Sequence, residues 1–107
     1  METQTSYRTF MISKLRNLDE RSLLNAILGL TGESGECADL LKKNMFHGHV
    51  LDFAKMVEEL GDIRFYLEQA TYAMGVSMKY IEEMNMEKLN KRYPEGFESE
   101  RSINRKD

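Results

Sequence analysis

The sequence predicts an all-α protein, a bundle of four helices, and three observations support this fold class. Apolar residues recur at steps of three or four along most of the chain, and strand-like alternation is absent. The lone proline, Pro94, follows the last periodic segment. The chain of 107 residues is 41% hydrophobic and 31% charged, which suits one compact domain with a modest core. We expect that domain to span residues 1–97, followed by a polar tail over 98–107.

The first helix is expected from Ser6 to Leu18. Its apolar residues follow the helical step and are Tyr7, Phe10, Met11, Leu15 and Leu18. Either Asp19 or Ser22 can cap the next helix, because each side chain offers an oxygen to the free N–H groups at a helix start.

The second helix is expected to continue from this cap to about Asn44. Its apolar side carries Leu23, Leu24, Ile27, Leu30, Thr31, Ala38 and Leu41. Gly29, Gly32 and Gly35 fall inside this helix, where each glycine costs about 1 kcal/mol relative to alanine. Gly29 lies one turn before Glu33, so its missing side chain leaves room either for a ligand or for a closely packed helix.

The third helix is expected from about Asp52 to Met74, with Gly75 ending it. We expect one apolar stripe of this helix to be buried, formed by Met56, Leu60, Ile63, Leu67, Ala70 and Met74. A second face, about 100° around the helix, carries Lys55, Glu59, Asp62 and Tyr66. A core-facing stripe and a chemical face therefore coexist on one helix.

The fourth helix is expected to begin after Ser77, which can cap it, and to run to about Tyr93 before Pro94 and Gly96. One of its faces carries Ile81, Asn85, Lys88 and Arg92. The tail beyond it is polar, and we expect it to be mobile or to dock on a neighbouring subunit.

Two acidic pairs of equal spacing, Glu33-Ser-Gly-Glu36 and Glu59-Leu-Gly-Asp62, predict a metal site. Residues three apart on a helix are neighbours, so each pair aims two carboxylates in one direction, and an antiparallel partner helix could bring all four together. Four carboxylates that close would repel strongly without a cation, and Mg²⁺ binds carboxylates together with substrate phosphates. The pattern predicts Mg²⁺-dependent phosphate chemistry, although either pair alone is common on a solvated helix.

Hydrolysis of a phosphoanhydride needs charge neutralisation, a positioned water and a stabilised leaving group. We expect Glu33 to orient or deprotonate the water and Glu36 to act beside it. Lys88 and Arg92, one turn apart, can hold phosphate oxygens, or they can form a solvated basic face near a helix end. Further substrate contacts are expected from Lys55 and Asn85 and, for the base, from Tyr66.

The charge and cysteine content disfavour several other classes of protein. The formal net charge of −3 gives no general attraction for a nucleic acid polymer. The single cysteine, Cys37, excludes an internal disulfide and is read as a packing residue. No window has the roughly 18 apolar residues of a membrane span, and no signal segment is evident, so we expect a cytoplasmic protein. His47 and His49 are expected on an exposed loop, since neither follows a glutamate by three positions as in helical di-iron sites.

With these residues the chain resembles the MazG-type family of all-α nucleoside triphosphate pyrophosphatases, relatives of the dimeric dUTPases. The resemblance spans roughly Leu23 to Phe97 and rests on three blocks in order: Gly32-Glu33-Ser34-Gly35-Glu36, Glu58-Glu59-Leu60-Gly61-Asp62 and Asn85-Met86-Glu87-Lys88-Leu89-Asn90-Lys91-Arg92-Tyr93-Pro94-Glu95-Gly96-Phe97. It implies an oligomeric helical bundle with Mg²⁺ on the four carboxylates, cleaving nucleoside triphosphates to monophosphate and pyrophosphate. Some family members stack the base on tryptophan, which this chain lacks, so its base preference stays open.

Three hypotheses follow for the function. The first is a nucleoside triphosphate pyrophosphohydrolase that controls nucleotide pools or removes damaged nucleotides. The second keeps the metal site but takes a specialised substrate, such as phosphoribosyl-ATP or dUTP. The third is a non-catalytic helical oligomerisation or regulatory module. We expect a homodimer or homotetramer, because eight methionines and several long apolar stripes give more apolar surface than one small bundle easily covers.

Overall fold

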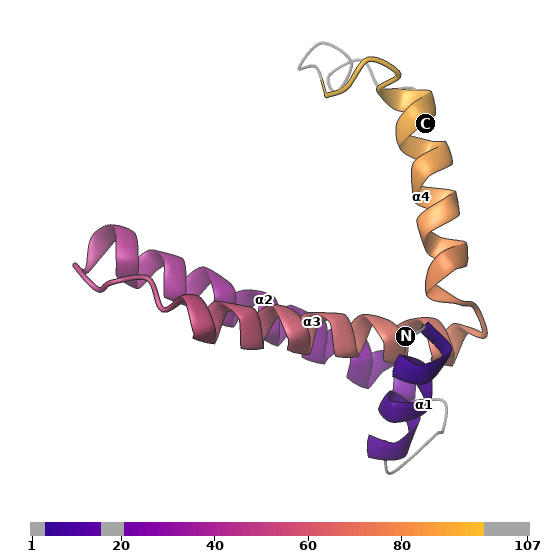
Figure 1. Cartoon of the computed structure of the whole chain (residues 1–107), viewed down its shortest axis with the longest axis horizontal. Coiled ribbons are helices and arrows are strands. Elements are labelled where there is room, and N and C mark those ends of the chain that lie inside the picture. The colour runs from indigo at the N-terminus through magenta and orange to yellow at the C-terminus, as the bar shows by residue number, and fades with distance from the viewer. Residues whose placement is uncertain (1–3, 16–20, 98–107) are drawn as a thin grey trace. The chain divides into compact units, whose positions relative to one another are not determined.

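The computed structural model describes residues 4–15 and 21–97, and these residues form four helices and no strand. The helices are α1 (Gln4–Lys14), α2 (Ser22–Phe46), α3 (Phe53–Met74) and α4 (Met78–Arg92), as labelled in Figure 1. The predicted all-α class is confirmed. The chain divides into two compact units, one reaching to Gly75 and one beginning at Val76, and each is described by itself.

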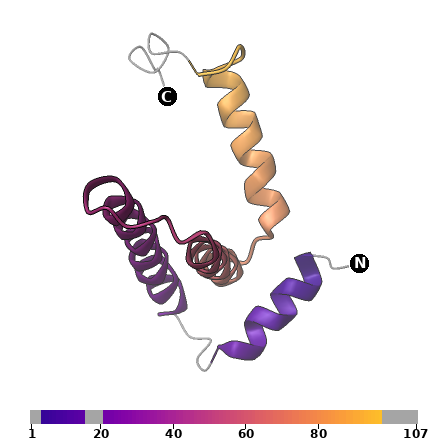
Figure 2. The same cartoon turned by 60° about the vertical axis from the view of Figure 1, so that its left-hand side comes forward.

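The first unit is built on a hairpin of α2 and α3, which lie side by side in both views (Figure 1; Figure 2). The turn between them is held by two hydrogen bonds: His49 N–H donates to the Lys43 carbonyl at 3.1 Å, and Asn44 Nδ2 donates to the His49 carbonyl at 2.9 Å. Gly48 has a φ of +74°, a conformation that favours glycine. The turn reverses the chain, so residues of the two long helices can face each other.

The ends of α3 are fixed by local signals that the sequence predicted. Asp52 is the N-cap, and its side chain accepts a hydrogen bond from the Lys55 N–H at 3.0 Å. Gly75 is the C-cap with a φ of +75°, and its N–H donates to the carbonyls of Thr71 and Tyr72. Both predicted boundaries are confirmed.

The start of α2 differs from the prediction that Ser22 caps it. Arg21 is the N-cap residue, it makes no side-chain capping hydrogen bond, and Ser22 is the first helical residue. Ser22 is buried and contacts α3 instead, because Gln69 Nε2 donates to its carbonyl at 2.9 Å. The alternative cap, Asp19, lies outside the described residues.

The first helix also ends earlier than predicted. α1 stops at Lys14, and Leu15 follows it in a turn in which its N–H donates to the Ile12 carbonyl at 3.1 Å. Leu15 is therefore not helical, and Leu18 lies outside the described residues. Met11 anchors α1, since its side chain is completely buried.

The contact between α1 and α3 centres on one buried carboxylate, Glu68, which is 1% exposed. Arg8 Nε donates to Glu68 Oε2 at 2.6 Å, and Arg8 Nη2 donates to Thr71 Oγ1 at 2.8 Å. Arg64 Nη1 lies 2.8 Å from Glu68 Oε1, an ion pair without hydrogen-bond geometry. Two cations thus surround one buried anion, the condition under which a buried charge is tolerated.

The apolar stripe predicted to be buried on α3 is only partly buried. Ala70 is buried, but Leu60 is 53% exposed and Met74 is 65% exposed, so the prediction is wrong at these two positions. The reason is that α3 meets α2 through its chemical face, and Glu59 on that face is only 5% exposed. The stripe is turned partly outward in this chain.

The second unit contains α4, which has the predicted bounds to within one residue. Ser77 is its N-cap, and the Ser77 hydroxyl accepts a hydrogen bond from the Tyr80 N–H at 3.0 Å. Tyr93 is the C-cap, and its ring lies 4.7 Å from that of Phe97, measured between centroids. Among the described residues, no helix is both long and apolar enough to span a membrane.

Candidate metal centre

Three carboxylates meet between the two long helices of the first unit. Glu33 comes from α2, and Glu59 and Asp62 come from α3. One carboxylate oxygen from each residue lies within 4.8 Å of the others. We call this group the carboxylate cluster. Within residues 4–15 and 21–97, no second group of three His, Cys, Asp or Glu side chains comes this close.

A hydrogen bond between Glu33 and Glu59 links two carboxyl groups of the cluster. The pKa of Glu33 is raised to about 7, first because its carboxyl group donates a hydrogen bond to Glu59, then through burial and the charges of Glu59, Asp62 and Glu36. The pKa of Glu59 is lowered, first by accepting that hydrogen bond from Glu33 and then by accepting one from Lys55. In the absence of a cation, Glu33 is therefore mostly protonated beside ionised Glu59 below about pH 7.

Within the described part of the chain, the cation that contacts the cluster is Lys55. Its Nζ lies 3.1 Å from Glu59 Oε1 and 3.6 Å from Glu58 Oε2. The pKa of Lys55 is raised, chiefly because it donates a hydrogen bond to Glu59. Its side chain is 49% exposed, so the positive charge is well screened by water and offsets the three carboxylates only in part.

The donor set fits a hard divalent cation. All three groups are carboxylates, and oxygen ligands of this kind suit Mg²⁺, Ca²⁺ or Mn²⁺ better than softer metals. The raised pKa of Glu33 shows that the fold brings the carboxylates together more closely than their charges favour. A cation at the cluster would relieve the repulsion that a proton relieves in its absence.

Glu36 lies one turn beyond Glu33 on α2 and is exposed. Its carboxylate is not among the three that lie within 4.8 Å of one another. It is near enough for its charge to raise the pKa of Glu33. The structure thus groups three of the four predicted ligands, and a ligand role for Glu36 stays a prediction.

Gly29 lies one turn before Glu33 and lets α3 approach α2 closely. A Cβ atom on Gly29 would overlap the ring of Tyr66, whereas a Cβ on Gly32 or Gly35 would meet nothing within 4 Å. Of the two explanations that the sequence left open for Gly29, the structure shows the closely packed helix. Tyr66 is thereby fixed one turn beyond Asp62 on α3.

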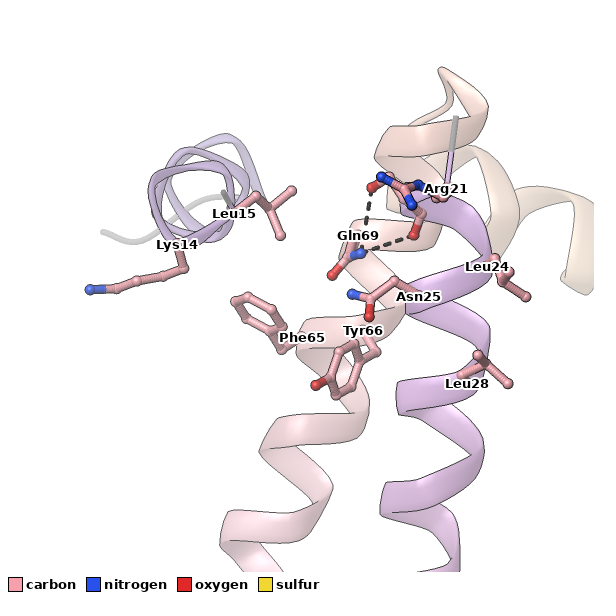
Figure 3. Close-up of a pocket in the computed structure, with 10 residues that line it drawn as sticks. Lys14, Leu15, Arg21, Leu24, Asn25, Leu28, Phe65, Tyr66 and Gln69 are labelled. Atoms are coloured by element: carbon pink, nitrogen blue, oxygen red, sulfur yellow. Dashed lines mark hydrogen bonds between the residues drawn. The ribbon is translucent and has the colours of Figure 1, made fainter. Parts of the chain in front are cut away.

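A pocket of about 610 Å³ opens beside Tyr66, at the end of α2 and α3 nearest α1 (Figure 3). It is lined by Lys14, Leu15, Arg21, Ser22, Leu24, Asn25, Leu28, Phe65, Tyr66 and Gln69. Of these residues, Tyr66 alone was predicted from the sequence to bind substrate. Gln69 was not predicted from the sequence. Its spacing could have indicated it, because it lies seven positions after Asp62 and so continues the chemical face of α3.

The remaining candidates lie away from the cluster or in the second unit. Asn85, Lys88 and Arg92 are on α4, so their part in the site remains a prediction. His47 and His49 are exposed in the turn after α2, as expected from the sequence. Cys37 is half-buried on α2.

The sequence matches the family model of the MazG nucleotide pyrophosphohydrolase domain over residues 21–97. This range covers most of the chain and contains α2, α3 and α4 with every carboxylate discussed above. Comparison with curated proteins finds no match, and comparison with solved structures finds none either. The family match and the carboxylate cluster lead to the same conclusion: the chain belongs to the MazG nucleotide pyrophosphohydrolase family.

Proposed function

We propose that this protein is a Mg²⁺-dependent nucleoside triphosphate pyrophosphohydrolase that releases a nucleoside monophosphate and pyrophosphate, in nucleotide pool control or in the removal of damaged nucleotides. Membership of the family implies nucleotide pyrophosphohydrolase activity. The observation that carries the finer proposal is the cluster of Glu33, Glu59 and Asp62, whose carboxylate oxygens lie within 4.8 Å of one another. Such a group binds a hard cation or must hold a proton.

Glu33, Glu59 and Asp62 would hold the cation, with Glu36 as a fourth ligand. When bound, Mg²⁺ would neutralise charge on the triphosphate and orient it for attack. The burial of Glu59, which is 5% exposed, supports its role as a fixed ligand, because a buried carboxylate needs a partner. Lys55 would hold Glu59 in place through their 3.1 Å ion pair and would reach substrate phosphate from there.

Glu33 would orient the attacking water and accept a proton from it. A carboxyl group must be ionised to take a proton, and a bound cation would favour the charged form of Glu33 by lowering its pKa from about 7. Glu33 also lies on α2, opposite the ligands of α3, so it can act on a water from the other side of the cluster. Glu36, which is exposed on the same helix, would act beside it.

The phosphate and base contacts are assigned from the chemistry of the side chains. Lys88 and Arg92 on α4 would bind phosphate oxygens, one as a point charge and one as a planar fork, with Asn85 beside them. Tyr66, fixed against Gly29, would contact the nucleoside.

The exposed apolar residues support a homodimer or homotetramer. Large apolar side chains of α2 and α3 outside the pocket are at least half exposed, and they include Met45, Phe46, Val57, Leu60 and Met74. Residues 1–97 would form the single catalytic domain, with 98–107 as a polar tail, and we place the protein in the cytoplasm. The nucleoside triphosphate is its small-molecule partner.

The test is pyrophosphate release from a panel of ribo-, deoxyribo- and modified nucleoside triphosphates, with Mg²⁺ and with a chelator. Mg²⁺-dependent release of pyrophosphate and monophosphate is the expected result. The Glu36→Gln variant decides whether three or four carboxylates are needed, and Glu58→Gln is its matched control, because the Glu58 side chain is 69% exposed and lies outside the cluster. Release from phosphoribosyl-ATP or dUTP alone would favour a specialised enzyme, and no release from a folded protein would favour a non-catalytic module.

A further inference from the structure

Gln69 carries a buried hydrogen-bond acceptor that the protein leaves without a partner. The residue is 2% exposed, and its Oε1 has no hydrogen-bond partner among the described residues. Its Nε2 donates to the Ser22 carbonyl at 2.9 Å and lies 3.4 Å from Ser22 Oγ. A backbone carbonyl can only accept, so this bond fixes which end of the amide faces Ser22.

The fixed amide turns its oxygen away from Ser22 and into the pocket between α1 and the α2–α3 hairpin (Figure 3). A buried carbonyl oxygen with no donor loses hydration without compensation, and most such groups in native proteins find a partner. A donor supplied by a ligand in the pocket would satisfy it. The required ligand group is therefore an N–H or O–H, in a pocket lined both by apolar side chains and by Lys14, Arg21 and Asn25.

The walls of this pocket suit a flat heterocycle. Leu15, Leu28 and Phe65 supply apolar surface, and Tyr66 supplies an aromatic ring. The volume of about 610 Å³ is in the range of small-molecule sites. Asn25 presents a second amide to the same space (Figure 3).

The pocket and the carboxylate cluster lie along the same face of α3. Gln69 follows Asp62 by seven residues on one helix, which is about 10 Å along the helix axis. This separation is comparable with the length of a nucleoside between an edge of its base and its 5′ oxygen. Tyr66 lies between the two positions on the same face.

We propose that Gln69 Oε1 accepts a hydrogen bond from the exocyclic amino group of a nucleobase, so that the enzyme prefers cytosine and adenine nucleotides to their uracil and hypoxanthine counterparts. The inference rests on the proposed function, because it assigns the base end of the substrate whose phosphates meet the cluster. In uracil and hypoxanthine a carbonyl oxygen replaces the amino group. That oxygen would face Oε1, so two acceptors would meet and neither would be satisfied.

The first test uses the unaltered full chain and two matched substrate pairs, dCTP with dUTP and dATP with dITP. Each pair differs at the amino position and at the ring nitrogen beside it, which carries a proton in dUTP and dITP. We expect kcat/KM to favour the amino member of each pair by about tenfold, the scale of one buried hydrogen bond lost. A preference below about fivefold in either pair would overturn the inference.

The second test changes the acceptor. Gln69→Met keeps the length of the side chain without its oxygen and should bring the ratio of kcat/KM within each pair close to one. Thr31→Ala is the matched control: it removes an exposed hydroxyl of α2 that does not line the pocket, so its ratio should equal that of the unaltered protein. A ratio that Gln69→Met leaves unchanged would contradict the assignment.

A third measurement separates this inference from the proposed function and does not depend on a folded Gln69→Met variant. Binding of dCMP, dUMP, dAMP and dIMP to the unaltered protein is measured by NMR without Mg²⁺, following the Gln69 side-chain amide. Tighter binding of the amino member of each pair, with a shift of that amide, supports the pocket even if no triphosphate is hydrolysed. Hydrolysis without discrimination, in contrast, leaves the proposed function standing and removes the role of Gln69.

Discussion

Glu59 and Glu68 are both buried on α3, yet their neighbours carry opposite charges. Glu68 meets two guanidinium groups, with Arg8 at 2.6 Å and Arg64 at 2.8 Å. Glu59 meets the carboxyl group of Glu33 and the carboxylate of Asp62, and its cation, Lys55, is half exposed. Glu68 therefore has two guanidinium groups to itself, whereas Glu59 shares one half-exposed cation with the other carboxyl groups of the cluster. The difference separates a carboxylate that holds the fold from one that is available to a ligand.

The largest expected effect is on activity, when a residue of the carboxylate cluster is changed. Asp62→Asn replaces one oxygen of a proposed metal ligand by a neutral amide of the same shape, so we expect kcat/KM to fall by about a thousandfold or more with unchanged helicity. Pyrophosphate release and circular dichroism measure the two quantities. Glu58→Gln, one position before Glu59 but outside the cluster, should keep its activity. Full activity of Asp62→Asn would remove Asp62 from the site.

The next largest effect is on the stability of the protein, when Glu68 is changed. Glu68→Ala removes the shared anion and leaves Arg8 and Arg64 without it, so we expect a loss of about 3 kcal/mol in the free energy of unfolding. Urea denaturation measures this loss. Asp62→Asn should lose little stability, because it removes repulsion. Equal losses in the two variants would show that the two ends of α3 do not differ as proposed.

A smaller effect is expected at Gly29, because it packs against Tyr66, which lies on α3 between Glu59 and Glu68. Gly29→Ala places a methyl group in the ring of Tyr66 and should cost about 1–3 kcal/mol, with a fall in activity as Tyr66 moves. Gly32→Ala is the matched control on the same helix. Its methyl group meets nothing within 4 Å, so it should stabilise the helix by up to about 1 kcal/mol. A stabilised Gly29→Ala would contradict the close packing.

The smallest effect is the pH dependence of the metal-free protein. The pKa of Glu33 rises from 4.5 to about 7 on folding, so its contribution to stability is complete below about pH 4.5 and is lost as the pH rises through 7. Glu59 has a lowered pKa, so its contribution to stability is lost as the pH falls, at more acidic pH. Thermal unfolding without divalent cations should show the decline between pH 4.5 and 7. Mg²⁺ should reverse it, and Glu33→Gln should abolish it, whereas an identical decline in that variant would place its origin elsewhere.

The boundaries that the sequence predicted correctly are those set by local interactions. Asp52, Gly75 and Ser77 cap the helices beside them, and each cap bonds to backbone groups within four residues. The start of α2 was predicted incorrectly because the partner of Ser22 is Gln69, which is far away in the sequence and unknown to a local pattern. Caps are visible in sequence, and contacts across the hairpin are not.

The carboxylate cluster was predicted in part for the same reason. The spacing of Glu59 and Asp62 puts both on one face of α3, and any antiparallel neighbour with acids could complete the group. The spacing does not determine how far along the hairpin the two helices meet. That register brings Glu33 into the group of three and leaves Glu36 outside it.

The sequence by itself determined the all-α class, the family and the helix that carries each acidic residue, because helical period, capping and motif spacing are local properties. Tertiary structure alone decided that Leu60 is exposed while Glu59 is buried, and that Glu59 and Glu68 have opposite surroundings. The physical reason is that burial and charge balance depend on which face of α3 meets its neighbours. Packing between helices sets that face, and the pattern of one helix does not contain it.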